Sequence, residues 1–94
     1  MRGLSQKFLN IMRKKLEHGR QKGYVGWDNH WENSRFPYDS TQYMVDRLHH
    51  EVDELIIAIF KDDPKQIFYE AADVANFAMF IADLQQKDGK EFPP

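Results

Sequence analysis

The sequence IFYEAADVANFAMFIADL, residues 67–84, carries the strongest structural signal in the chain. Its apolar residues are spread around all sides of a helix instead of forming one stripe. A helix of this kind is buried on every side, and three helices in a chain of 94 residues supply too few neighbours to enclose it. This stretch therefore predicts a helix that is partly covered by a second subunit.

Capping signals mark both ends of this helix. Asp63 is followed by Pro64 and then by Gln66, which is the order of an N-cap, a first-turn proline and an N3 glutamine. Gly89 and the two terminal prolines stop the helix after about Gln86.

Two more helices are predicted before it. Residues 4–22 place apolar side chains at helical spacing, with basic residues between them. A second apolar stripe starts behind Asp39, an N-cap candidate with Gln42 three positions on, and runs to about Lys61. The predicted fold class is all-α, with three main helices per chain that oligomerisation completes into a four-helix-type bundle.

Residues 23–39, GYVGWDNHWENSRFPYD, form a long aromatic loop between the first two helices. The segment has neither helical nor strand periodicity, and it holds five aromatic residues. Connections of this length often bind a ligand, but aromatic rings in a loop also cap a core. Both interpretations stay open.

Size and composition indicate a single domain over residues 1–94. The chain is 41% hydrophobic and 30% charged, which is not typical of disorder. It has no cysteine, so disulfides and thiolate metal sites are excluded. No apolar run approaches the roughly 18 residues of a membrane span, and the N-terminus lacks a signal-peptide core. We expect a soluble, cytoplasmic protein that gains stability by self-association.

Charge is divided unevenly along the chain. Residues 1–23 hold seven basic residues and one acid, for +6, whereas residues 24–94 hold six and fourteen, for −8. The basic segment could bind nucleic acid, lie near an anionic ligand, or pair with the acidic remainder. Nucleic acid is the weakest of the three, because the acidic majority repels a phosphate backbone.

Two acid pairs stand at i, i+3 spacing: Glu51 with Glu54 on the second helix, and Glu70 with Asp73 on the third. Helical geometry puts each pair on one face. Ionised carboxylates in so apolar a helix are strongly destabilising unless something compensates their charge. A divalent cation removes both that penalty and the repulsion between the acids, and oxygen ligands suit Mg²⁺ or Mn²⁺. We therefore predict that all four acids bind Mg²⁺, with Mn²⁺ as the alternative.

Other interpretations of the acids also fit the pattern. The first pair could be a solvated helix face, and the second could pair with Arg47 or with the basic first helix. A carboxylate-bridged di-iron centre ranks third, because it requires Glu-x-x-His and no glutamate here has histidine three positions on.

The order E-x-x-E, spacer, E-x-x-D resembles that of the MazG-like, all-α nucleoside triphosphate pyrophosphohydrolases. In this chain it reads Glu51-Val-Asp-Glu54, fifteen intervening residues, then Glu70-Ala-Ala-Asp73. Three wider segments are similar to a bacterial and phage branch of that family: HGRQKGYVGWD at 18–28, RLHHEVDEL at 47–55 and EAADVANFAMFIAD at 70–83.

The resemblance implies hydrolysis of a (d)NTP to the monophosphate and pyrophosphate, often as house-cleaning of the nucleotide pool. It also implies that the four acids hold Mg²⁺ and that the chain forms a dimer or a tetramer. On this basis Glu51 or Glu54 is expected to orient or deprotonate the attacking water. His50 stands where many relatives have a second glutamate, so this chain has one acid fewer.

Substrate contacts are predicted from residues near the acids. Asn76 lies one helical turn beyond Asp73, where its amide suits a base or a sugar hydroxyl. Trp27 or Trp31 could stack on a base, and we favour Trp27 because it lies in the family-like GYVGWD stretch. The candidates for the outer phosphates are Lys14, Arg20 and Lys22.

A different class of function also agrees with the pattern. In a non-catalytic helical interaction module, such as an adaptor or a toxin–antitoxin partner, buried acids would specify subunit pairing. Such a module binds no Mg²⁺ and releases no pyrophosphate, and this separates it from the enzyme.

Overall fold

The computed structural model describes residues 3–21 and 41–94, which form three α-helices and no strand. These are α1 (Gln6–Gln21), α2 (Thr41–Phe60) and α3 (Pro64–Lys87). The all-α class predicted from the sequence is confirmed, whereas the aromatic loop at 23–39 and its Asp39 cap lie outside the described residues. None of these three helices has the length and hydrophobicity that a membrane crossing needs.

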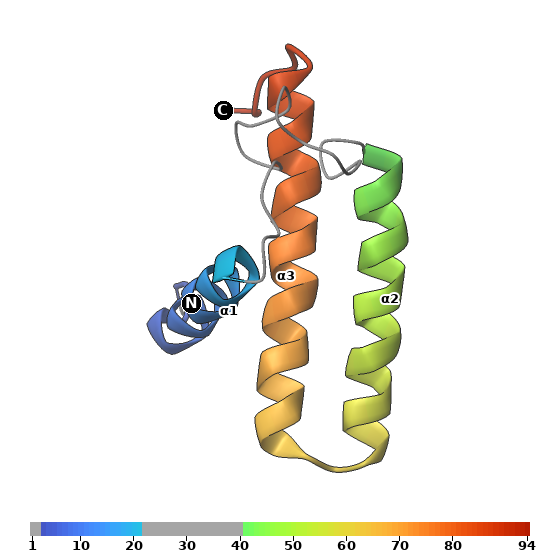
Figure 1. Cartoon of the computed structure of the whole chain (residues 1–94). Coiled ribbons are helices and arrows are strands. Elements are labelled where there is room, and N and C mark those ends of the chain that lie inside the picture. Colours follow the sequence, from blue (N-terminus) through green and yellow to red (C-terminus); the bar gives the residue numbers. More distant parts are fainter. Residues whose placement is uncertain (1–2, 22–40) are drawn as a thin grey trace.

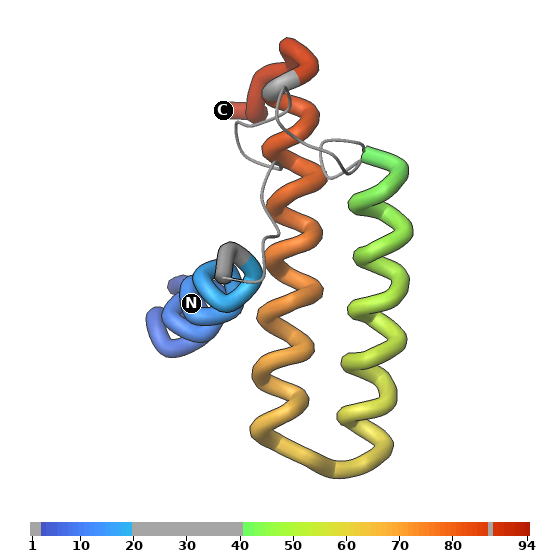
Figure 2. The backbone as a smooth tube through the Cα atoms, in the orientation of Figure 1, coloured from blue at the N-terminus to red at the C-terminus, as the bar shows by residue number. Residues whose placement is uncertain are grey.

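α2 and α3 form an antiparallel hairpin, and α1 packs against the other side of α3 (Figure 1). Figure 2 shows that the two hairpin helices stay side by side along the whole of α2. α3 is therefore the central element, with one neighbouring helix on each side.

The ends of α3 agree with the capping signals. The Asp63 side chain accepts a hydrogen bond from the Gln66 amide at 3.2 Å, and Pro64 takes the first helical position. Gly89 has a φ of 90°, a conformation that residues with a Cβ rarely adopt, and it follows the last turn of α3. The predicted N-cap, proline and glycine stop are thus confirmed.

A turn of three residues, 61–63, joins α2 to α3. Asp62 has a left-handed φ of 51°, and the Asp63 amide donates back to the Ala58 carbonyl at 3.3 Å. So short a connection leaves two antiparallel helices little freedom to slide along one another.

This turn places the two acid pairs at the same height along the two antiparallel helices. Positions that are equally far from the turn centre, Asp62, come to the same height on antiparallel helices. Glu51 and Asp73 each lie eleven positions from Asp62, and Glu54 and Glu70 each lie eight. The short turn therefore places the acids of α2 opposite those of α3.

The hydrophobic core is small and lies between the three helices. Met44 and Leu84 are fully buried, and Phe80 packs with them. The rings of Phe77 and Phe80 meet edge to face, with centroids 5.2 Å apart. Leu16 adds a contact from α1, which attaches α1 to the hairpin.

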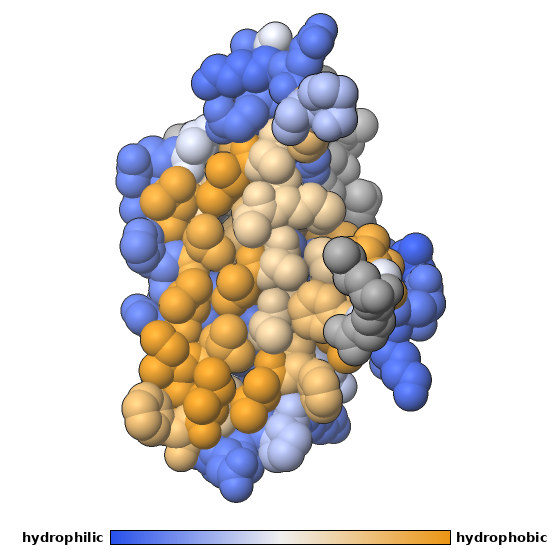
Figure 3. Space-filling model, turned by 180° about the vertical axis from the view of Figure 1, so that it is seen from behind, coloured by the Kyte–Doolittle hydropathy of each residue, from blue (hydrophilic) through white to orange (hydrophobic). Residues whose placement is uncertain are grey.

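One chain does not bury the apolar surface of the hairpin. Phe68 on α3 is exposed, as are Ile57, Ile59 and Phe60 on α2. Figure 3 shows apolar side chains gathered over α2 and α3 on the face turned away from the viewer in Figure 1. The described residues, 3–21 and 41–94, therefore do not enclose α3 on all sides, and completion of the bundle by a second copy stays a prediction.

Asp63→Ala tests the cap that begins α3. The substitution removes the acceptor of the Gln66 amide, so we expect the free energy of unfolding to fall by about 1 kcal/mol in urea denaturation followed by circular dichroism. Asp63→Asn keeps an oxygen acceptor and should remain within about 0.3 kcal/mol of the parent chain. Equal losses in both variants would show that the charge, not the cap, stabilises α3.

Candidate metal centre

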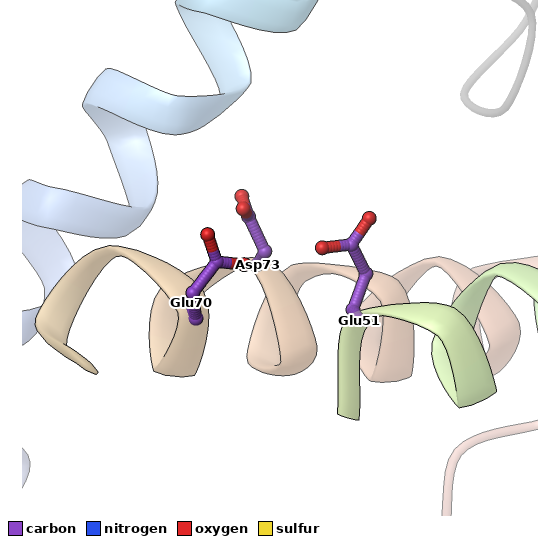
Figure 4. A group of neighbouring side chains, drawn as sticks. All are labelled: Glu51, Glu70 and Asp73. Atoms are coloured by element: carbon purple, nitrogen blue, oxygen red, sulfur yellow. The ribbon is translucent and has the colours of Figure 1, made fainter. Parts of the chain in front are cut away.

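Three carboxylates from the two hairpin helices meet at one point. Glu51 from α2 and both Glu70 and Asp73 from α3 each offer an oxygen, and these oxygens lie within 4.8 Å of one another. Figure 4 shows the three side chains extended toward the same side of the hairpin, the side on which α1 crosses. The structure thus brings together three of the four acids predicted as metal ligands.

Two of these acids are deeply buried. Glu51 is 4% exposed and Glu70 is 7% exposed. Oε2 of each is shielded from solvent and accepts no hydrogen bond from any described residue. A buried carboxylate oxygen without a partner is strongly unfavourable unless a proton or a cation supplies the missing interaction. The two oxygens therefore fit a divalent cation, which binds free carboxylate oxygens.

Glu54, the fourth predicted ligand, is not one of the three acids whose oxygens all converge, but its side chain interacts with both Glu51 and Glu70. Its Oε1 is 3.0 Å from Nε2 of His50, one turn back on α2, and its side chain is 42% exposed. Burial raises the pKa of Glu54, but other effects outweigh burial and hold this pKa below its ordinary value. They are the hydrogen bonds with Glu51 and Glu70 and the charges of His50 and Arg47. Glu54 is thus an ionised, accessible carboxylate at the rim.

Burial controls the protonation of the two deepest acids. It raises the pKa of Glu51 to about 7, with the neighbouring Glu54 adding to the rise and Arg47 opposing it. Burial also raises the pKa of Glu70, against the effect of the hydrogen bond that Gln66 Nε2 donates to its Oε1. Without a cation, protons therefore compensate part of the charge in this site.

Two basic side chains also compensate the acids. Arg47 Nη2 donates to Glu51 Oε1 at 2.7 Å, and Lys15 Nζ from α1 lies 3.4 Å from Asp73 Oδ2. Burial raises the pKa of Asp73, and Lys15 acts to lower it. These two cations and all four acids line one cavity of about 370 Å³. When the four acids are ionised, these two cations of the described residues leave two negative charges uncompensated, which is the charge that one divalent ion supplies.

Asn76 is the predicted substrate contact that lies in this cavity among the described residues. It is buried, and its Nδ2 donates to the Met12 carbonyl at 3.1 Å, which leaves Oδ1 as an acceptor without a partner in the described chain. Lys14 is exposed and does not line the cavity, whereas Lys15 does. The predicted contacts outside the described residues or side chains are Arg20, Lys22 and Trp27.

The predicted alternative in which the acids of α3 pair with the basic first helix is confirmed for Asp73, which contacts Lys15, although the sequence does not single out that lysine. Arg47 precedes Glu51 by one turn, a spacing that favours an ion pair, yet the sequence suggests it only as a partner for the acids of α3. Lys15 has no local signal, because its partner Asp73 is 58 positions away and their contact depends on how α1 crosses α3.

The metal-free protein should lose stability as the pH rises. The pKa of Glu51 is about 7 in the folded chain against an ordinary value of 4.5, so the folded state binds more protons than the unfolded state between these pH values. The stability contribution is present in full below pH 4.5 and is lost as the pH rises to 7. We expect the free energy of unfolding to fall by on the order of 2 kcal/mol over this range, measured by urea denaturation with EDTA.

Glu51→Gln is the control for this profile, because an amide has no proton to lose. The variant should show a flatter dependence on pH. Saturating Mn²⁺ should reverse the slope of the parent chain, since a metal binds the ionised acids. A metal-free parent chain that gains stability over the same range would contradict the raised pKa of Glu51.

Comparison with other proteins assigns no family to the chain. No protein-family model, no curated protein and no solved structure matches it. A functional assignment therefore depends on the residue pattern and on the geometry of the acidic cavity.

Proposed function

We propose that the protein is a Mg²⁺-dependent nucleoside triphosphate pyrophosphohydrolase, which converts a (d)NTP to the monophosphate and pyrophosphate. The observation that carries this proposal is the pair of buried oxygens, Glu51 Oε2 and Glu70 Oε2, that lack a partner within the described chain. They lie in an acidic cavity that two cations compensate only in part. The order of the acids, which resembles that of the MazG-like enzymes, supports the same function.

The acids divide into ligands and a rim group. Glu51, Glu70 and Asp73 hold the ion, with Mn²⁺ as the alternative to Mg²⁺, and Glu54 completes the set from the rim. When bound, the ion supplies charge neutralisation and lowers the pKa of a water. Of the two candidate bases, Glu54 is the more accessible to water, because Glu51 is buried and bonded to Arg47. No nucleophilic side chain is required, since positioning and charge neutralisation dominate phosphoryl-type transfer.

The cavity also suits a nucleotide in size and chemistry. Its volume of about 370 Å³ lies within the range of about 300–1,000 Å³ that small-molecule sites occupy. Asn76 Oδ1 accepts no hydrogen bond from the described residues, so it fits a base amine or a sugar hydroxyl. Stacking of the base on Trp27 belongs to the same proposal, although that residue lies outside the described part of the chain.

Self-association and location complete the proposal. The exposed apolar residues of α2 and α3 form a surface that a second copy can cover, as a homodimer or a homotetramer. We place the protein in the cytoplasm, where the nucleotide pool lies and where a chain without cysteine needs no oxidising conditions. House-cleaning of that pool is the role that this reaction would serve.

A non-catalytic interaction module is the second candidate, and the ion pairs favour it. The contacts Arg47–Glu51 at 2.7 Å and Lys15–Asp73 at 3.4 Å compensate part of the acidic charge without any metal. In such a module the acids would determine how helices pair, and neither metal nor nucleotide would bind.

A pyrophosphate-release screen separates the two candidates. The full chain is incubated with each common and modified (d)NTP, in Mg²⁺ and in EDTA. We expect release that depends on Mg²⁺ for at least one nucleotide. Release from none of them would leave the interaction module as the function.

Glu70→Gln tests the role of the buried acids. The amide has nearly the shape of the acid but loses the charge that binds the ion, so the helical circular-dichroism spectrum should persist. Turnover should fall by at least about 100-fold, since even groups that only support metal ligands contribute about 10- to 100-fold.

Asp53→Asn is the matched control for Glu70→Gln. Asp53 is exposed on α2 and lies between the two acids of the first pair without joining the cluster. Its substitution removes the same charge and should leave turnover within about twofold of the parent chain. Near-parent turnover in Glu70→Gln would count against the proposed metal site.

A further inference from the structure

We infer that Lys15 is an exchange residue, whose ammonium pairs with Asp73 in the metal-free protein and binds the phosphates of the substrate once a metal occupies the acids. This role rests on the proposed function and deepens it. It assigns phosphate binding to the first helix through a residue that the acid motif does not contain.

Lys15 approaches the acids from α1, which crosses the side of the hairpin toward which the acids extend (Figure 4). Its Nζ lies 3.4 Å from Asp73 Oδ2 and 5.7 Å from the ring centroid of Tyr69. The side chains of Lys15 and Asp73 are 27% and 19% exposed, so solvent reaches both. Partly exposed ion pairs and cation–π contacts are individually weak, and the ammonium is therefore free to leave.

Lys15 and a metal ion compete for the same carboxylate. Asp73 is one of the three acids whose oxygens converge, and it is the one that the ammonium contacts. A divalent ion on Asp73 cancels the attraction for the ammonium and repels it directly. The lysine stem has four carbons, so the ammonium can swing away while the backbone of α1 keeps its place.

The released ammonium remains in the cavity because α1 is anchored there. Asn76 Nδ2 donates to the carbonyl of Met12, one turn before Lys15, at 3.1 Å. Lys15 itself lines the cavity together with the acids. A metal-bound triphosphate brings anionic oxygens into this space, and an ammonium is a strong partner for phosphate.

Arg47 is less suited to such an exchange. Its guanidinium contacts Glu51 from the same helix at 2.7 Å and also lies 5.6 Å from the ring centroid of Phe77. Arg47 uses Oε1 of Glu51, and Oε2 stays without a partner in the described chain. Arg47 and Glu51 lie one turn apart on the same helix, so their contact can persist when an ion binds Oε2, whereas Lys15 reaches Asp73 from a separate helix.

Two binding measurements on the full chain with Lys15→Met test the exchange. Calorimetry first measures Mn²⁺ binding without any anion, and then measures binding of inorganic tripolyphosphate in saturating Mn²⁺. Removal of the competing ammonium should tighten Mn²⁺ binding about threefold to fivefold. Loss of the phosphate partner should weaken tripolyphosphate binding at least about tenfold.

Two further variants serve as controls. Lys7→Met removes the same charge from an exposed position two turns earlier on α1, and it should leave both affinities within about twofold of the parent chain. Lys15→Arg keeps the positive charge and should restore most of the tripolyphosphate binding. If Lys15→Met folds poorly, Lys15→Gln repeats both measurements, because it also removes the charge but keeps a polar side chain.

The opposite signs of the two effects distinguish exchange from other roles. A lysine that only holds α1 in place would weaken both kinds of binding when removed, and that result would overturn the inference. Unchanged Mn²⁺ affinity in Lys15→Met would also overturn it, as would a loss of tripolyphosphate binding in Lys14→Met instead.

The exchange and the proposed function fail in different ways. Absence of pyrophosphate release refutes the enzymatic function, but it leaves the two binding measurements interpretable. If Lys15→Met does not bind Mn²⁺ more tightly and tripolyphosphate more weakly than the parent chain, only the exchange is refuted. A parent chain that binds no Mn²⁺ overturns both, because the metal is the competitor that frees Lys15.

Discussion

The three-residue turn between α2 and α3 is the constraint on which the site depends. Spacing within each helix puts two acids on one face, but the turn decides whether the two faces meet at the same height. One residue inserted between the turn and Glu70 would rotate the acids of α3 by about 100° and shift them by about 1.5 Å. Tyr69 and Ala72 would then take the places of Glu70 and Asp73 opposite the acids of α2. The Asp63 cap and the left-handed Asp62 therefore contribute to the site although neither touches it.

At Glu51, metal binding and ion pairing do not exclude one another, whereas at Asp73 the ion and the ammonium of Lys15 compete. From the sequence they are alternatives, because each compensates the same buried acids. In the structure Arg47 occupies one oxygen of Glu51 and leaves the other without a partner in the described chain, and Lys15 contacts Asp73 from a different helix. The two cations reduce the repulsion among the four clustered acids in the folded chain. They leave an excess of negative charge that a divalent ion would neutralise. The two ion pairs are thus compatible with a metal site at the same acids.

Features that depend on local chemistry could be predicted, and features that depend on helix crossing could not. The start of α3 follows from Asp63 and Pro64, and the pairing of acids on each face follows from i, i+3 geometry. The position of Lys15 required knowledge of how α1 crosses α3. Glu54 was indistinguishable from the other acids by spacing, yet its contact with His50 holds it at the rim. The apolar residues on all sides of α3 indicate a buried helix. The sequence does not tell whether residues of the same chain or of a second copy cover it.

Two contacts that hold α1 also line the acidic cavity. α1 is attached near the acids by the Met12 carbonyl on Asn76 and by Lys15 on Asp73, and these two α3 residues are one turn apart. Both lie in the cavity, so a ligand that binds either one acts on the anchorage of α1. One N–H of Asn76 Nδ2 is used for that anchorage, which leaves its second N–H and the acceptor Oδ1 for recognition. A ligand at these two side chains would therefore act on two contacts of α1, whereas the packing of Leu16 against the core keeps the helix itself in place.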